Sequence, residues 1–134
     1  MSDTQWGSLL VGCIGALLLA LTGPLYWAVT RSAARGGLEP NWAVGLRTPS
    51  TLYSQKTWQA GHRAALPWAR ATAVWTVACG IALIVSQAAL ARSGGTSGVL
   101  YTVLFFCLVL GVFTGVIVGK NVAARATWEA CNAE

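Results

Sequence analysis

The sequence predicts an all-α membrane protein with three transmembrane helices and a cytoplasmic loop that contains a short interfacial helix. Of the 134 residues, 55% are hydrophobic and only 10% are charged, whereas a soluble domain has roughly 25% charged residues. Three apolar runs without acidic residues, at about 8–30, 67–91 and 98–119, reach the roughly 20 helical residues that cross a hydrocarbon core. Because lipid offers no hydrogen bonds to the backbone, helices are the expected spanning form. We expect one membrane domain over residues 1–134.

The first apolar run, 8–30, could be a cleavable secretory signal or a retained helix. Its leader carries Asp3 and no Lys or Arg, and the apolar stretch continues past Pro24 to Trp27. A signal peptide has a basic leader and a shorter apolar region. We therefore expect a retained transmembrane helix.

The loop over 31–66 begins with a turn-rich connector, and helix-start signals follow it. Thr48 is a good helix N-cap, and Pro49 suits the first helical position, where its missing N–H is not needed. We therefore expect a helix from about Pro49 to Ala64. One side of this helix would carry Leu52, Trp58, His62 and Leu66, and its flank would carry Lys56 and Arg63. Such a helix is expected to rest in the inner headgroup layer, with its basic flank towards phosphates.

The basic residues predict the orientation of the chain. Of the nine, eight lie in or beside the loop over 31–66 or after the third run, and only Arg92 lies in the second loop. Cytoplasmic loops carry the excess of Lys and Arg. We expect a bacterial plasma-membrane protein with its N-terminus outside and its C-terminus, with the residues 120–134 as a short tail, in the cytoplasm. The net charge of +5 indicates anionic lipid headgroups, not nucleic acid, as its partner.

The sequence contains few residues that could catalyse a reaction. It contains one histidine and four acidic residues, and it has no Gly-rich phosphate loop and no zinc-ligand spacing. Catalysis needs positioned acids, bases or nucleophiles. We predict no enzymatic activity, no catalytic residue, no cofactor and no metal site. The four cysteines, which lack CxxC spacing, are expected to pack as small apolar side chains; they are Cys13, Cys79, Cys107 and Cys131.

Small residues recur every four positions in each apolar run. They are Gly111, Gly115 and Gly119 in the third run, Gly12, Ala16 and Ala20 in the first, and Thr72, Thr76 and Gly80 in the second. A groove without side chains lets another helix approach closely. Two uses of the glycine groove remain open: packing within the three-helix bundle, and contact with a second copy or another membrane protein.

A polar, basic block interrupts the apolar sequence and supplies the candidate site. Its residues are Asn41, Gly45, Arg47, Thr48, Pro49, Trp58, His62 and Arg63. The planar guanidinium of Arg47 can hold a carboxylate, a phosphate or several carbonyls in fixed geometry, and Gly45 indicates a tight backbone position. Either these side chains bind a ligand or partner, or Asn41, Arg47 and His62 tie the loop to the helix ends. We expect His62 to orient its neighbours by hydrogen bonds and not to act as a pH switch.

This pattern, with Gly-x-Arg-Thr-Pro at its centre, resembles the SdpI family of small integral membrane proteins. The resemblance is detailed from Asn41 to Arg63 and extends by hydropathy to Gly119. It implies a multi-pass plasma-membrane protein without enzymatic activity. The best-studied member protects against a secreted killing peptide and sequesters a transcriptional repressor at the membrane; it has more membrane helices before the motif. Val44 and Leu46 stand where we expect an aromatic residue and an isoleucine.

Two functional hypotheses from different classes follow. In the first, the protein acts in immunity or signalling towards a membrane-active peptide, through its cytoplasmic loop and helix grooves, with a peptide toxin or a cytoplasmic regulator as its partner. In the second, it is an accessory subunit that packs against a larger membrane complex and has no ligand of its own. A large partner that co-purifies stoichiometrically in mild detergent would favour the second hypothesis.

Overall fold

The structure, a computed structural model, describes residues 3–41, 43–93 and 98–132. It contains the helices α1 (Asp3–Ala34), α2 (Gln55–Ser93) and α3 (Gly98–Asn132). Each of the three is long and apolar enough to cross a membrane. The prediction of an all-α membrane protein with three transmembrane helices is therefore confirmed.

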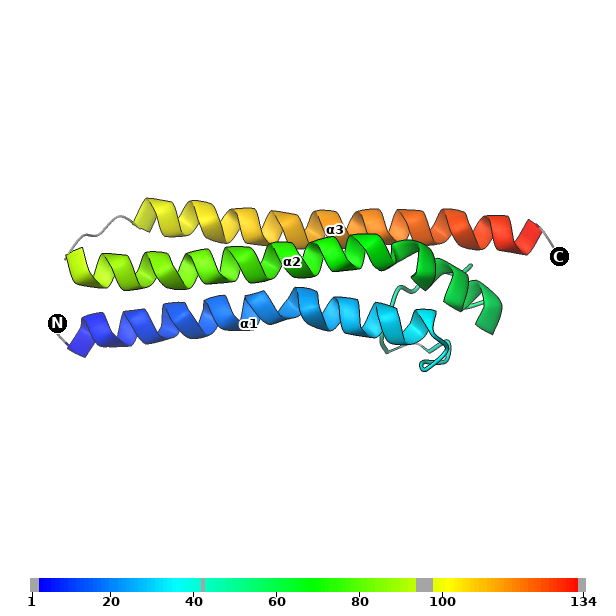
Figure 1. Ribbon diagram of the computed structural model, residues 1–134, viewed down its shortest axis with the longest axis horizontal. Coiled ribbons are helices and arrows are strands. Elements are labelled where there is room, and N and C mark those ends of the chain that lie inside the picture. The colour runs from blue at the N-terminus through cyan, green and yellow to red at the C-terminus, as the bar shows by residue number, and fades with distance from the viewer. Residues whose placement is uncertain (1–2, 42, 94–97, 133–134) are drawn as a thin grey trace.

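The three helices are arranged around α2, which lies between the other two and packs against both (Figure 1). In contrast, α1 and α3 make few contacts with each other. The start of α1 lies at the end of the molecule where α2 ends and α3 begins, and the end of α3 lies beside the loop at the opposite end (Figure 1). The loop and the C-terminal turns therefore share one end of the molecule.

Each helix is longer than the apolar run that predicts it. The 39 residues of α2 extend about 58 Å at 1.5 Å per residue, whereas a hydrocarbon core is about 30 Å thick. The predicted tail after residue 119 is helical as far as Asn132. At the loop end, these additional turns pack with the loop into a unit that we call the headpiece. It comprises residues 35–41, 43–66 and 119–132.

The helix predicted from Pro49 to Ala64 differs from the observed one. Residues 49–52 form turns, and the helix begins only at Gln55, which is the first residue of α2. Proline removes a helical N–H and bends the helix, and α2 bends near Pro67 so that its first turns tilt away from its long axis (Figure 1). The predicted apolar face does not lie open to headgroups, because Trp58 and His62 are both 0% exposed.

The buried core is small and divides into two clusters. In the bundle, Leu83 of α2 and Leu108 of α3 pack with small residues of α1 and α2. In the headpiece, Leu46 of the loop packs with Ala65 of α2 and Ala123 of α3. The outward faces of the helices are covered with large apolar side chains, which suits a surface surrounded by lipid.

Candidate functional site

The end of α1 is closed by a glycine cap and by an arginine from α2. Gly36 has a positive φ of 82°, and the Gly37 N–H donates to the Ser32 carbonyl at 3.0 Å, as in a Schellman C-cap. The Arg63 Nε–H donates to the Ala34 carbonyl at 3.0 Å. Because the last carbonyls of a helix lack partners within it, Arg63 connects the start of α2 to the end of α1.

The loop then turns around Asn41. Its Oδ1 accepts hydrogen bonds from the backbone N–H groups of Ala43 at 3.0 Å and Val44 at 2.8 Å. Its Nδ2 donates to the Glu39 carbonyl at 2.8 Å. An asparagine side chain that bonds backbone two or three residues away substitutes for a backbone turn. Asn41 therefore shapes the approach of the chain to Gly45.

Gly45 lies directly against the rings of Trp58 and His62. Its φ is 103°, and a Cβ built on it would lie 2.9 Å from His62 Nε2 and 2.9 Å from Trp58 Cη2. The two rings contact each other, with centroids 4.1 Å apart. Only glycine combines this backbone conformation with so close an approach, so the tight position predicted at Gly45 is present.

His62 and Trp58 hold the loop to α2 by hydrogen bonds. The Leu46 N–H donates to His62 Nε2 at 3.0 Å, and His62 Nδ1 lies 2.8 Å from the Trp58 carbonyl. Since an amide can only donate, Nε2 is the acceptor and Nδ1 carries the proton of a neutral imidazole. The Trp58 Nε1–H donates to the Leu38 carbonyl at 2.8 Å. Both side chains are therefore engaged inside the headpiece.

Two helix caps follow each other between the loop and α2. The Thr51 N–H donates to Thr48 Oγ1 at 3.1 Å, and the Thr48 N–H donates to Thr51 Oγ1 at 2.8 Å. Ser54 and Thr57 repeat this reciprocal pattern at 3.2 and 3.0 Å. A capping box satisfies two backbone donors at a helix start. Thr48 thus caps a single turn, as its type predicts, but the N-cap of α2 is Ser54.

The headpiece loop also contacts α3. The Thr127 hydroxyl donates to Ser50 Oγ at 2.8 Å, and Thr127 and Thr51 are fully buried. A Cβ on Gly61 would lie 2.9 Å from Thr51 Cγ2 and 3.0 Å from Thr127 Cγ2. Gly61 therefore lets the loop, α2 and α3 meet. No local pattern indicates this meeting, because Ser50 and Thr127 are far apart in sequence.

The predicted site residues divide into an anchoring group, which contacts other parts of the headpiece, and an exposed group. Asn41, Gly45, Trp58, His62 and Arg63 form the contacts described above, and Thr48 caps the turn beside them. Arg47 and Pro49 are exposed on the outside of the loop. Two apolar side chains of the same loop are exposed as well, Val44 at 43% and Tyr53 at 77%.

The glycines of α3 receive side chains from α2. At Gly111, a Cβ would collide with the indole of Trp75, whose Nε1–H donates to the Cys107 carbonyl at 3.2 Å. At Gly115, a Cβ would collide with the Thr72 hydroxyl. Both glycines therefore serve packing within the chain, the first of the two uses left open by the sequence.

Gly119 has a different neighbour, Tyr26 of α1. The Tyr26 hydroxyl lies where a Cβ of Gly119 would be, with Ala65 of α2 beside it. The hydroxyl oxygen is buried, and among the described residues it has no hydrogen-bond partner. Tyr26 is thus one place where α1 reaches across α2 to α3.

A family model described as the SdpI/YfhL protein family matches residues 37–119. The matched segment includes the loop, α2 and the apolar part of α3, and it contains all eight candidate residues of the motif. Among curated proteins and among solved structures, no match to the chain is found. Since the match covers more than half of the chain and the three helices can each cross a membrane, this multi-pass membrane protein belongs to the SdpI/YfhL family.

Proposed function

We propose that the protein is a non-enzymatic immunity or signalling protein of the bacterial plasma membrane, which acts towards a membrane-active peptide through its headpiece loop. One observation carries this proposal: the anchoring group of the motif holds the loop by hydrogen bonds, while other side chains of the loop are exposed. The exposed side chains Val44, Arg47 and Tyr53 are here called the loop rim.

The anchoring group supports the proposal because it holds the loop in one conformation. Three contacts connect the loop or the end of α1 to the first turns of α2: Trp58 to the Leu38 carbonyl, His62 to the Leu46 N–H, and Arg63 to the Ala34 carbonyl. A surface that is already ordered loses less conformational entropy when a partner binds. The anchoring group is therefore the scaffold of the proposed binding surface.

The loop rim combines side chains that suit recognition. Tyrosine and arginine are enriched among the residues that contribute most to binding energy, and the guanidinium of Arg47 can bind a carboxylate with two parallel hydrogen bonds. Val44 and Tyr53 add apolar surface. We infer that the partner is amphipathic and carries an acidic group. With the loop on the cytoplasmic side, this partner is a regulator in the cytoplasm or a peptide that has reached the inner leaflet.

The test is survival of a peptide-sensitive bacterium that expresses the protein during challenge with a membrane-active peptide. We expect Tyr53→Ala, Arg47→Ala and Arg47→Lys to lose protection, while Tyr53→Ala and Arg47→Lys keep membrane abundance and unfolding free energy near those of the wild type. Lysine keeps the charge of Arg47 but not its planar geometry. Trp128→Ala is the matched control, since Trp128 is 68% exposed on the headpiece part of α3.

Four results would contradict the proposal. Full protection by all the rim variants would remove the rim from the function, and loss of abundance in step with protection would make the rim a structural element. Absence of protection by the abundant wild-type protein would argue against an immunity role. Stoichiometric recovery of a larger membrane protein, without any effect on survival, would assign the protein to the accessory-subunit class.

A further inference from the structure

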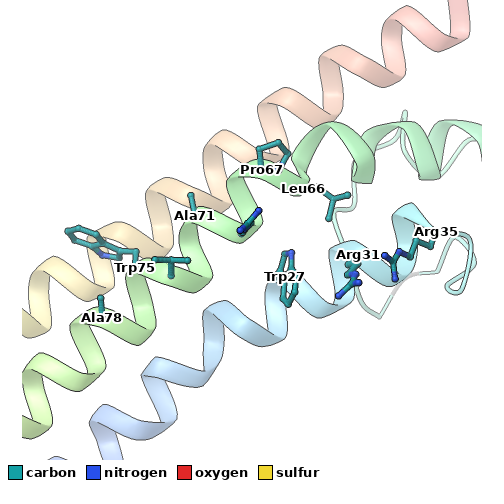
Figure 2. A pocket seen from close by; sticks show the side chains of 10 residues that line it. Trp27, Arg31, Arg35, Leu66, Pro67, Ala71, Trp75 and Ala78 are labelled. Carbon is teal, nitrogen blue, oxygen red and sulfur yellow. The ribbon is translucent and has the colours of Figure 1, made fainter.

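A groove between α1 and α2 opens on the bundle beside the headpiece. It has a cavity volume of about 1090 Å³. Figure 2 shows Trp27, Arg31 and Arg35 on α1 on one side of this groove, and Leu66, Pro67 and Ala71 on α2 on the other. The groove is separate from the loop rim, because it shares no residue with Val44, Arg47 and Tyr53.

Three arginines converge on the headpiece end of the groove. Arg31 and Arg35 come from α1 and Arg70 comes from α2, and no acidic residue lies among the residues that line it. The Arg31 guanidinium carbon lies 5.2 Å from the centroid of the Trp27 ring, a cation–π distance. A cluster of three positive charges without acidic neighbours in the groove is complementary to an anionic group.

Away from the arginines the groove becomes apolar. A second hollow of about 500 Å³ shares Trp27, Arg70, Val74 and Ala78 with the first and continues along α2 to Ile81. Arg70 is the one charged residue among its lining side chains. The two hollows together therefore form a continuous surface that is cationic at one end and apolar at the other.

The helices create this space by diverging. A Cβ on Gly23 would collide with the Thr76 side chain, so α1 and α2 are in close contact there. Directly after this contact, Pro24 interrupts the helical hydrogen bonds of α1, and Pro67 does the same in α2. Figure 1 shows α1 moving away from α2 towards the loop end. On α1 the groove extends from Pro24 to Arg35, and on α2 it extends from Leu66, beside the headpiece, along the helix to Ile81.

The position of the groove along the membrane normal suits a lipid molecule. Arg31 follows the predicted span 8–30 directly, and Arg70 lies within the first turn of the span 67–91, so the arginines are at headgroup level. Ile81 lies three turns deeper along α2, in the hydrocarbon region. Basic pockets between transmembrane helices near the membrane surface are typical sites for anionic lipid headgroups.

We propose that this groove binds one anionic phospholipid. Its phosphate lies between Arg31, Arg35 and Arg70, and one acyl chain runs along Val74 and Ala78 towards Ile81. The apolar half of the groove distinguishes a lipid from a free phosphate, which would use the arginines alone. This inference is independent of the proposed immunity function, because it concerns a different surface.

The test uses the full chain in mild detergent, with phosphatidylglycerol or phosphatidylcholine added and bound lipid counted by native mass spectrometry. We expect one tightly held phosphatidylglycerol per chain and no corresponding phosphatidylcholine. Arg31→Gln/Arg70→Gln should bind phosphatidylglycerol about thirtyfold more weakly, as the removal of two arginines near an anionic headgroup predicts. Lys120→Gln/Arg125→Gln removes two charges from exposed positions of the headpiece part of α3 and should leave binding unchanged.

A second pair of variants tests the acyl-chain half without altering charge. Ala78→Phe fills the groove at a residue that lines both hollows, and it should reduce lipid retention. Val103→Phe, at an exposed position of α3, should not. The proposal is overturned if neither lipid is retained, if both lipids are retained equally, or if both charge variants lose lipid equally. It is also overturned if Ala78→Phe binds lipid like the wild type, or if soluble glycerol phosphate displaces the lipid at equal concentration.

Discussion

Replacement of His62 by leucine should destabilise the headpiece through one defined hydrogen bond. His62 is fully buried, and its Nε2 accepts a hydrogen bond from the backbone N–H of Leu46 at 3.0 Å. Leu46 is itself only 3% exposed. Leucine fills a similar space but offers no acceptor. A buried donor left without a partner costs about 1–3 kcal/mol, so we expect the unfolding free energy to fall by about that amount. His62→Gln, whose side-chain carbonyl can accept, should recover part of the loss.

The unfolding free energy can be measured by titrating SDS into mixed micelles and following tryptophan fluorescence. Tyr53→Leu is the control, since Tyr53 is exposed in the same loop and exposed substitutions stay within about 0.5 kcal/mol. A value for His62→Leu within about 0.5 kcal/mol of the wild type would show that the Leu46–His62 bond does not hold the loop. A full loss in His62→Gln as well would show that ring packing, and not the acceptor, is responsible.

Three further predictions address the helices, the loop and the topology. Gly115→Leu should lower the unfolding free energy by about 1–3 kcal/mol through overpacking against α2. Gly15→Leu, at an α1 position with open space beyond the glycine, should not lower it. Equal effects of the two substitutions would contradict the packing role of Gly115. Gly45→Ala should destabilise by at least about 1 kcal/mol because its φ is positive, in contrast to Gly7→Ala, and an unchanged melt would refute the tight contact with the rings. A membrane-impermeant thiol reagent should label Gly7→Cys in intact cells and should label Cys131 only after permeabilisation; the reverse pattern would invert the proposed orientation.

Local sequence signals determined the fold class and several details of the loop. Continuous apolar runs without acidic residues cross a membrane as helices because lipid leaves the backbone no other partner, and all three helices are present. The tight position at Gly45 and the capping role of Thr48 were also predictable. These features depend on the backbone preferences of a residue and its near neighbours, which the sequence contains directly.

The helix start predicted at Pro49 was wrong because the sequence contains two helix-start signals. Thr48-Pro49 and Ser54 both carry helix-start signals, and the chain uses both, with a single turn after the first and the long helix after the second. The choice between them is made by contacts distant in sequence: Thr51 is fully buried against Gly61 of α2 and Thr127 of α3. Local propensity is overridden when tertiary packing favours another boundary.

Only the tertiary structure decided which faces of the helices meet. In a soluble helix the apolar stripe marks the buried face, but in a membrane the lipid-facing side is as apolar as the packed side. The sequence therefore showed that Gly111 and Gly115 form a groove, and the structure identified Trp75 and Thr72 as its occupants. For the same reason the arginines of α1 and α2 were recognised only as a topology signal. Their convergence on one groove depends on how the two helices rotate and diverge, and the order of residues along either helix does not contain that information.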